Sequence, residues 1–359
     1  VRMARRLLET LHEPFSIADC ELFVTASIGI SLCPRDGWDG ATLQRNADSA
    51  MFRAKSLGKQ SFQFFMPEMD IAVQERLYLE TQLWRALERH ELSLHYQPLV
   101  ALDGQIVGAE ALLRWHHPEH GPVPPLKFIP LAEESGAIIP IGTWALQEAC
   151  RQNDAWQRAG YAPIYVSVNV SAVQFTQPHF FDMVNQALAE SRLAPQYLQL
   201  ELTESVLMGD FRFLARLLSR LRDLGISIAV DDFGIGYSSL SYLQQLPIDT
   251  LKIDQSFIQG ISTDIHVPAS NQAIVRSIMT LAQSLGVRVI AEGVEAEQQL
   301  EFLRHIGCQV VQGRLFGMAL PADDFETVLH QNQQRSLCYP AEVIALPAWD
   351  TSGHSESLH

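Results

Sequence analysis

The sequence is poor in cysteine and in positive charge, and it has no long apolar run. Its five cysteines, Cys20, Cys33, Cys150, Cys308 and Cys338, form no close pairs. This excludes a disulfide framework and a thiolate metal site, and it predicts a reducing, cytoplasmic location. Lysine and arginine number 26 against 41 aspartates and glutamates, for a formal charge of −15. That balance argues against a duplex nucleic-acid partner, which requires a basic face.

No segment is long and apolar enough to span a bilayer, and no signal sequence opens the chain. We therefore expect no membrane contact from these 359 residues. The chain starts at Val1 rather than at methionine, so we expect it to be part of a longer protein. A membrane anchor in a preceding segment stays open.

Two patterns divide the chain. Residues 1–65 resemble a small α/β piece, with helices expected near 7–11 and 41–57 and strands near 23–31 and 61–65. A connecting helix is expected over 66–90, because apolar residues recur there at mostly helical spacing. A larger domain is expected over 75–333, and residues 334–359 lack periodicity and are expected to form a disordered tail.

In the larger domain, short apolar runs alternate with amphipathic helical stretches. The eight runs cover 92–100, 107–113, 164–170, 198–202, 226–230, 250–253, 288–291 and 309–311. This alternation predicts an α/β fold, a closed TIM-like (β/α)8 barrel. Only residues 101–106 separate the first two runs, which is too short for a parallel crossover. The first strand is therefore predicted to be antiparallel to the second.

Polar side chains interrupt the apolar runs at their carboxyl ends, where barrel enzymes carry their active sites. They are Glu110, Asn169, Glu201, Glu204, Asp231, Asp232, Lys252, Glu292 and Gln312. Burying so many carboxylates requires strong cationic partners, and one lysine is too few. Because the set offers oxygen ligands without histidine or cysteine, we expect Mg²⁺ or Mn²⁺, with two ions near the paired aspartates.

Each of these residues also has an ordinary structural explanation. An acidic residue at a strand end, such as Glu204 or Glu295, is more often a helix cap or a salt-bridge partner. Lys252 could extend to the surface, and Gln97 could be a polar strand end. A structural explanation of the whole set would have to place six ligands at corresponding barrel positions independently, so function is favoured.

Two weaker motifs remain. His116, His117 and His120 lack the spacing of a zinc site and are expected in a solvated loop. The turn from Gly234 to Ser239 resembles a phosphate-binding glycine-rich turn, which is a weak signal when it stands alone.

The motifs of the larger domain resemble, in order, those of the EAL-domain cyclic di-GMP phosphodiesterases. They are Glu110-Ala111-Leu112-Leu113-Arg114-Trp115, Asn169-Val170-Ser171, Glu201-Leu202-Thr203-Glu204, Asp231-Asp232-Phe233-Gly234, Leu251-Lys252-Ile253-Asp254, Ala291-Glu292-Gly293-Val294-Glu295 and Gln312-Gly313. The resemblance implies a metal-dependent hydrolase that converts cyclic di-GMP to linear 5′-pGpG by two-metal-ion catalysis in bacterial second-messenger signalling. It also implies a homodimer formed through this domain.

The resemblance further implies roles for single residues. The implied metal ligands are Glu110, Asn169, Glu201, Asp231, Asp232 and Glu292. The implied catalytic residues are Glu110, Lys252, Glu292 and Glu295, with Lys252 positioning the attacking water. The implied substrate contacts are Gln97, Leu113, Arg114 and Gln312, and Glu204 would anchor the loop after Asp232. Ile235 departs from the family pattern, which commonly has threonine there.

Residues 1–65 resemble the C-terminal part of a GGDEF diguanylate cyclase domain, through segments 24–30 and 46–55. No Gly-Gly dipeptide occurs in the chain, so the metal- and GTP-binding hairpin of that family is missing and no cyclase activity is expected. Part of a domain is also expected to expose apolar surface.

Two other functions stay open beside the phosphodiesterase. One is a receptor module that binds cyclic di-GMP without cleaving it; such members usually lose metal ligands, and none is lost here. The other is a barrel hydrolase for a different phosphodiester, which strand-end chemistry alone does not exclude.

Overall fold

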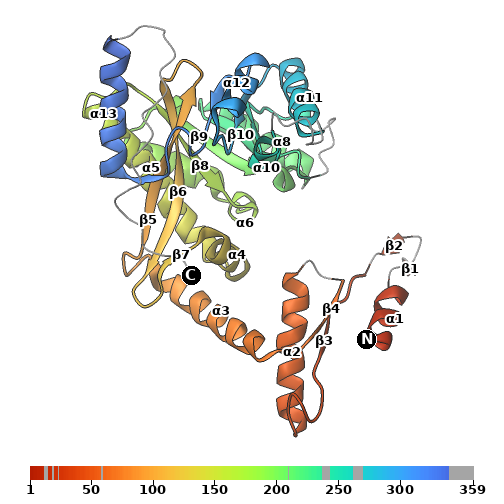
Figure 1. Ribbon diagram of the computed structural model, residues 1–359. Helices are drawn as coiled ribbons and strands as arrows, with labels where there is room; N and C mark the ends of the chain where they lie inside the picture. Colours follow the sequence, from red (N-terminus) through yellow and green to blue (C-terminus); the bar gives the residue numbers. More distant parts are fainter. Residues whose placement is uncertain are drawn as a thin grey trace. The chain divides into compact units, whose positions relative to one another are not determined.

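The computed structural model describes residues 1–11, 15–17, 20–22, 24–57, 60–208, 210–236, 243–261 and 270–338. The chain forms two compact units, Val1–Arg85 and Ala86–His359, whose elements are labelled in Figure 1. The connecting helix expected over 66–90 is α3 (Pro67–Ala86), which ends at the boundary between the units. No helix in the described part of the chain could cross a membrane.

The first unit contains two further helices and four short strands. They are α1 (Arg2–Thr10), α2 (Gly40–Ser56), β1 (Phe15–Ile17), β2 (Cys20–Leu22), β3 (Ile28–Ile30) and β4 (Phe62–Phe64). β3 and β4 pair in parallel, and α2 packs on β3. Gly29 permits this approach, because a Cβ there would clash with the carbonyl oxygen of Ala47. Trp38 is 84% exposed, in line with the apolar surface expected of a partial domain.

The second unit is a closed barrel of eight strands. They are β5 (Leu92–Ala101), β6 (Ile106–His117), β8 (Tyr165–Val170), β9 (Leu198–Thr203), β10 (Ser227–Phe233), β11 (Thr250–Ile253), β12 (Arg288–Ala291) and β13 (Val310–Val311). The sheet runs β5-β13-β12-β11-β10-β9-β8-β6, and the pairing of β5 with β6 closes it. β5 is antiparallel to both of its barrel neighbours, β6 and β13. The TIM-like fold and the antiparallel first strand are therefore confirmed.

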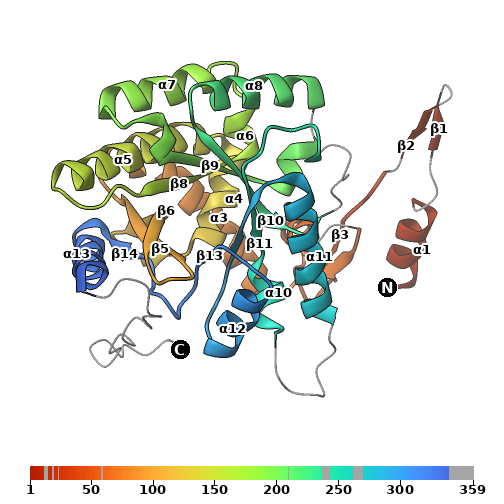
Figure 2. The same ribbon diagram turned by 90° about the horizontal axis from the view of Figure 1, so that it is seen from above.

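Helices form a layer outside the strands (Figure 2). They are α4 (Pro125–Ser135), α5 (Ile138–Arg158), α6 (Ala172–Phe175), α7 (Phe180–Ser191), α8 (Phe211–Asp223), α10 (Gln255–Gln259), α11 (Ser270–Leu285), α12 (Glu297–His305) and α13 (Ala322–Cys338). Two 3₁₀ turns, η1 (Pro195–Tyr197) and η2 (Glu204–Met208), flank β9.

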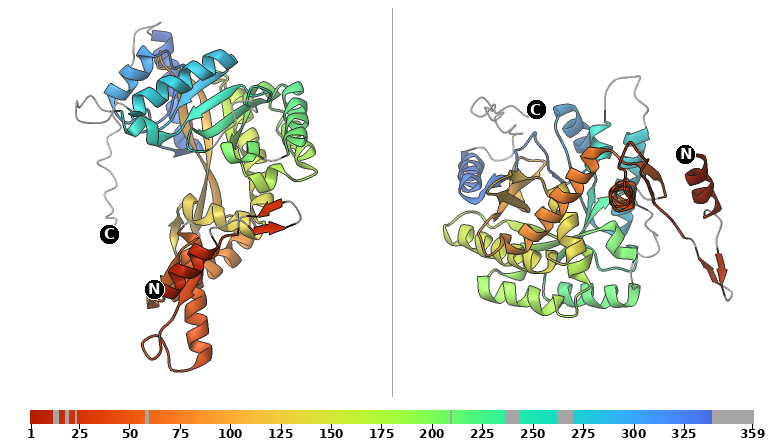
Figure 3. Two further views of the ribbon diagram at one scale, coloured as in Figure 1. Left: turned by 90° about the vertical axis from the view of Figure 1, so that its right-hand side faces the viewer. Right: turned by 90° about the horizontal axis from the view of Figure 1, so that it is seen from below.

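Two features of this unit differ from the expectation, the extra short strands and the length of the last helix. The short strands β7 (Gly121–Val123) and β14 (Leu320–Pro321) extend the sheet beyond the barrel and were not predicted. α13 packs beside β5 (Figures 1 and 3), with the rings of Tyr96 and Phe325 6.1 Å apart. Because α13 ends at Cys338, residues 334–338 are helical, and the rest of the expected tail, 339–359, lies outside the described residues.

Apolar and polar side chains alternate along the barrel strands. The apolar ones belong to the hydrophobic core, and the polar ones lie on the other face of the strand, inside the barrel. In β9, Leu198, Leu200 and Leu202 belong to the hydrophobic core, while Gln199 and Glu201 take the positions between them. Neighbouring side chains of a strand lie on opposite faces. β8 and β11 repeat the pattern with the inward pairs Ser167 and Asn169, and Thr250 and Lys252.

Candidate active site

One lysine lies among carboxylates from four other segments of the barrel. The Nζ atom of Lys252 is 2.7 Å from Glu201, 2.6 Å from Glu292, 3.3 Å from Asp231 and 3.6 Å from Glu110. The Lys252 side chain is fully buried. The acids that the sequence placed at separate strand ends therefore converge on a single buried ammonium group.

Sheet hydrogen bonds continue past the strand ends and position the last site residues. The backbone N–H of Glu292 donates to the carbonyl of Ile253 at 3.1 Å, and that of Gln312 donates to the carbonyl of Ala291 at 2.9 Å. Glu292 directly follows β12, and Gln312 directly follows β13. Both side chains therefore start from regular sheet geometry rather than from a loose loop.

Amide side chains hold Glu110 in place. Asn169 Nδ2 donates to Glu110 Oε1 at 2.7 Å, and Gln312 Nε2 donates to Oε2 at 2.6 Å. Gln312 Nε2 also lies 3.1 Å from Gln97 Oε1, and Gln97 Nε2 donates to the carbonyl of Gly317 at 3.1 Å. Both Glu110 oxygens are engaged, so this buried carboxylate has a fixed orientation.

The cluster holds more negative charge than one ammonium can balance. Burial raises the pKa of Glu292 to about 8, and the nearby Asp231 and Glu110 carboxylates add to the rise although Lys252 opposes it. Burial, together with Glu110, also raises the pKa of Glu201 well above its ordinary value. Burial lowers the pKa of Lys252, but the surrounding carboxylates outweigh this and hold it well above the usual range. Further positive charge would therefore stabilise the ionised cluster.

The donor set fits hard divalent cations. Asp231, Asp232 and Glu292 can each bring one carboxylate oxygen within 4.8 Å of the others. Burial and the charge of Asp231 raise the pKa of Asp232, which is the effect a cation would reverse. Carboxylate and amide oxygens are the ligands that Mg²⁺ and Mn²⁺ prefer.

Glu204 holds the turn that follows the paired aspartates. Its Oε2 atom accepts hydrogen bonds from the backbone N–H groups of Gly234 and Gly236, each at 3.2 Å. Asp232 has a φ of 54°, a left-handed conformation that is uncommon outside glycine and is often found at functional sites. The glycine amides considered as a phosphate cradle thus bind a carboxylate of the chain itself. Residues 237–239 of that turn lie outside the described residues.

A cavity of about 540 Å³ opens over the acids. Its lining includes these predicted site residues: Gln97, Glu110, Arg114, Asp231, Glu292, Glu295 and Gln312. Leu112 lines it as well, whereas Leu113 is partly buried against the hydrophobic core. The side chain of Leu113 is thus not among the described groups that line the cavity, and its carbonyl accepts a hydrogen bond from Arg114 at 2.9 Å.

Several lining residues were missed in the sequence. Arg314 holds Glu295 through two N–H groups, 2.7 and 2.9 Å from the same carboxylate oxygen. Gln255 and Met318 also line the cavity. Their positions in the sequence could have indicated them. Arg314 follows the predicted site residue Gln312 by two residues, and Gln255 begins the helix after β11.

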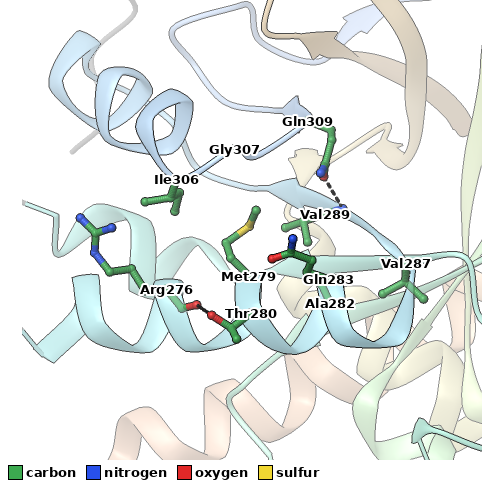
Figure 4. A pocket seen from close by; sticks show the side chains of 10 residues that line it. All are labelled: Arg276, Met279, Thr280, Ala282, Gln283, Val287, Val289, Ile306, Gly307 and Gln309. Atoms are coloured by element: carbon green, nitrogen blue, oxygen red, sulfur yellow. Dashed lines mark hydrogen bonds between the residues drawn. The ribbon is translucent and has the colours of Figure 1, made fainter.

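A second cavity lies at the opposite, amino-terminal end of β12, between α11 and the segment 306–309 that follows α12. It measures about 450 Å³ and is lined by residues that include Arg276, Met279 and Gln283 (Figure 4). Gln309 lies at its edge and accepts a hydrogen bond from the backbone N–H of Val289 at 3.0 Å. Among the described residues that line it there is no carboxylate.

The histidines are placed differently from the expectation. His116 and His117 end strand β6 rather than lying in a loop. His117 is 1% exposed, and its Nδ1 atom accepts hydrogen bonds from the backbone N–H groups of Glu119 and His120 at 3.1 and 3.2 Å. The prediction of a solvated loop was wrong for His117, because this side chain caps its own turn.

Residues 80–319 match the model of the EAL domain family. The chain belongs to this family. Residues 1–61 match the model described as the diguanylate cyclase GGDEF domain, so a short GGDEF segment precedes the EAL domain.

Relatives of this EAL-domain chain are named for cyclic di-GMP chemistry. The chain is 44% identical over 322 residues to the bifunctional diguanylate cyclase/cyclic di-GMP phosphodiesterase MucR of Pseudomonas aeruginosa, covering 89% of this chain and 46% of that one. It is 41% identical over 324 residues to the cyclic di-GMP phosphodiesterase PdeR of Escherichia coli, covering 90% and 48%. The chain thus spans about half the length of these relatives.

A solved structure resembles the EAL domain itself. The structure described as the MucR phosphodiesterase in complex with c-di-GMP has a TM-score of 0.66 and 45% identity. The match covers 69% of this chain and 99% of that one. The similarity therefore extends over that entire phosphodiesterase domain.

Proposed function

We propose that this chain hydrolyses cyclic di-GMP to linear 5′-pGpG, using two divalent cations, Mg²⁺ or Mn²⁺. The observation that carries this proposal is the group of buried carboxylates around Lys252, at the floor of a cavity that also contains Arg114. Bare carboxylates would repel a dinucleotide with two phosphates, so the arrangement favours cations that neutralise both. The cyclic di-GMP phosphodiesterases among the relatives support the choice of substrate.

The proposed ligands of the cations are Glu110, Asn169, Glu201, Asp231, Asp232 and Glu292. When bound, the cations would polarise a phosphate oxygen and make water more acidic. Lys252 keeps the carboxylates together and is proposed to orient the attacking water with its ammonium group. Glu110, Glu292 and Glu295 are proposed to take part in catalysis at the same cavity.

Arg114 is the proposed phosphate contact, since its guanidinium group lines the cavity and can donate paired hydrogen bonds. Gln97 and Gln312 offer amide groups beside it, and Leu113 is proposed to contact the substrate as well. Glu204 is proposed to anchor the loop that carries Asp232, through its bonds to Gly234 and Gly236.

We further propose a homodimer through the EAL domain and a cytoplasmic location. The dimer rests on the family resemblance, and a solution mass of one chain by light scattering would contradict it. The location is supported by Cys33, Cys150 and Cys308, which are free thiols and suit a reducing compartment.

The test of this function is turnover by the purified chain. With Mn²⁺ or Mg²⁺, we expect cyclic di-GMP to disappear and 5′-pGpG to appear in chromatography, and we expect EDTA to stop the reaction because the carboxylates then lack their cations. Cyclic di-AMP in the same assay controls for base specificity. Tight binding of cyclic di-GMP without product would instead indicate a receptor, and equal cleavage of unrelated phosphodiesters would indicate a general hydrolase.

A further inference from the structure

A row of buried polar side chains lies inside the barrel, one layer beneath the acids. Ser167 Oγ lies 2.5 Å from Glu201 Oε1 and 3.2 Å from Gln199 Oε1, and Gln199 Nε2 lies 3.2 Å from Thr250 Oγ1. Ser167, Gln199 and Thr250 are at most 1% exposed. They come from β8, β9 and β11 and meet across the barrel interior.

The position of these three side chains follows from the alternation of successive side chains between the two faces of a strand. Ser167, Gln199 and Thr250 each precede a proposed site residue by two positions, so each lies on the same face as that residue, one layer deeper. Ser167 and Gln199 are also direct partners in the register of β8 and β9.

The interior of such a barrel is ordinarily filled with branched apolar side chains. A buried hydroxyl or amide there is costly unless it is hydrogen-bonded. An ordinary structural explanation would be that the three groups simply satisfy one another. The three groups are not sufficient for one another, however, because the Ser167 hydroxyl also contacts the carboxyl group of Glu201, and this is its shortest contact.

The Ser167 hydroxyl has one hydrogen and two possible acceptors. The contact with Glu201 is 2.5 Å long, against 3.2 Å to the amide oxygen of Gln199, and the shorter contact is the better hydrogen bond. The proton therefore belongs to the bond with Glu201. Gln199, which donates to Thr250 Oγ1, lies beneath the serine without sharing that proton.

Two donors then set the orientation of Glu201. Ser167 engages Oε1, and the ammonium of Lys252 donates to Oε2 at 2.7 Å. Each oxygen keeps a lone pair for a further partner. Removing Ser167 would free Glu201 to turn about its terminal bond, which would cost a bound cation one well-placed ligand.

We propose that Ser167 is a positioning residue that orients the Glu201 carboxylate toward the cations of the active site. This inference rests on the proposed function, because it needs cations at the acidic cluster. It assigns to a buried serine a part in cation binding although it is not itself a proposed ligand of the cations or a substrate contact.

The test measures Mn²⁺ binding to the full chain without substrate, by electron paramagnetic resonance titration. Ser167→Ala is expected to weaken Mn²⁺ affinity about 10- to 100-fold, the usual effect of losing a partner of a metal ligand. Ser191→Ala is the matched control, since it removes another buried serine hydroxyl, which donates to the carbonyl of Ala187 within helix α7 rather than to an acid of the cluster. This control is expected to bind Mn²⁺ as the wild type does.

If Ser167→Ala does not fold, Ser167→Cys replaces it, because the thiol fills the site but donates hydrogen bonds poorly. Unchanged Mn²⁺ affinity in the folded variant overturns the proposal, and so does an equal loss in Ser191→Ala. Failure of the wild-type chain to bind Mn²⁺ would instead overturn the proposed metal centre. The two failures are therefore distinguishable.

Discussion

Replacing Glu110 with alanine is expected to lower the turnover of cyclic di-GMP by at least about 100-fold, comparable to the loss of one strong electrostatic group in an active site. Glu110 is held by Asn169 and Gln312 and faces Lys252. Its loss removes a proposed metal ligand, yet Lys252 keeps three carboxylate partners. The fold is therefore expected to survive, as circular dichroism and the rate of product formation would show together.

Glu91→Ala is the control for Glu110→Ala. Glu91 is also a buried carboxylate, and it accepts a hydrogen bond from Trp115 Nε1 at 3.0 Å, but it lies outside the acidic cluster. Its loss is expected to lower stability without removing turnover. Wild-type activity in folded Glu110→Ala would contradict the ligand assignment.

Lys252→Met is expected to destabilise the metal-free protein strongly. Methionine resembles the lysine stem in size but removes the ammonium, so four carboxylates would face one another without their cation. Breaking a buried ion pair by deleting one partner costs about 3–5 kcal/mol, which corresponds to a fall in Tm on the order of 10 °C for a domain of this size. Thermal unfolding in EDTA measures this fall.

Mn²⁺ is expected to restore part of the lost stability in Lys252→Met, because a cation that binds only the folded state raises its stability. Lys127→Met, at an exposed lysine of α4, is the control. Its Tm is expected to fall by much less than that of Lys252→Met, and by the same amount with and without metal. A Tm of Lys252→Met equal to that of the wild type in EDTA would show that the ammonium does not hold the cluster together.

Regular patterns in the sequence were sufficient to predict the barrel. Each of the eight apolar runs became a strand, because alternation with helical stretches permits few other folds. β7 and β14, of three and two residues, are too short to produce any periodicity. α13 extends past the predicted end of the domain through a polar segment. Asn332, one residue before that predicted end, bonds to the backbone of Ile106 and Gly104, a tertiary contact that local pattern does not reveal.

The strand-end acids could be predicted because a buried carboxylate is conspicuous in an apolar run. Ser167 and Thr250 were not predicted as part of the site, because small hydroxyl residues are common in strands. Their hydrogen bonds are made to residues of another strand, which the sequence does not show. The turn after Asp232 gave only a weak phosphate-binding signal, and its Gly234 and Gly236 amides bind Glu204 instead. Glu204 was predicted as the anchor of this loop from the family resemblance, because neither composition nor spacing pairs it with these amides.

The most direct test of the central claim is anomalous scattering from crystals of the chain grown with Mn²⁺ and cyclic di-GMP. We predict two manganese peaks within coordination distance of the acidic cluster, with Asp231, Asp232 and Glu292 among their ligands. Manganese absent from this cluster, or bound only elsewhere on the chain, would contradict the proposal that these carboxylates form a two-cation active site.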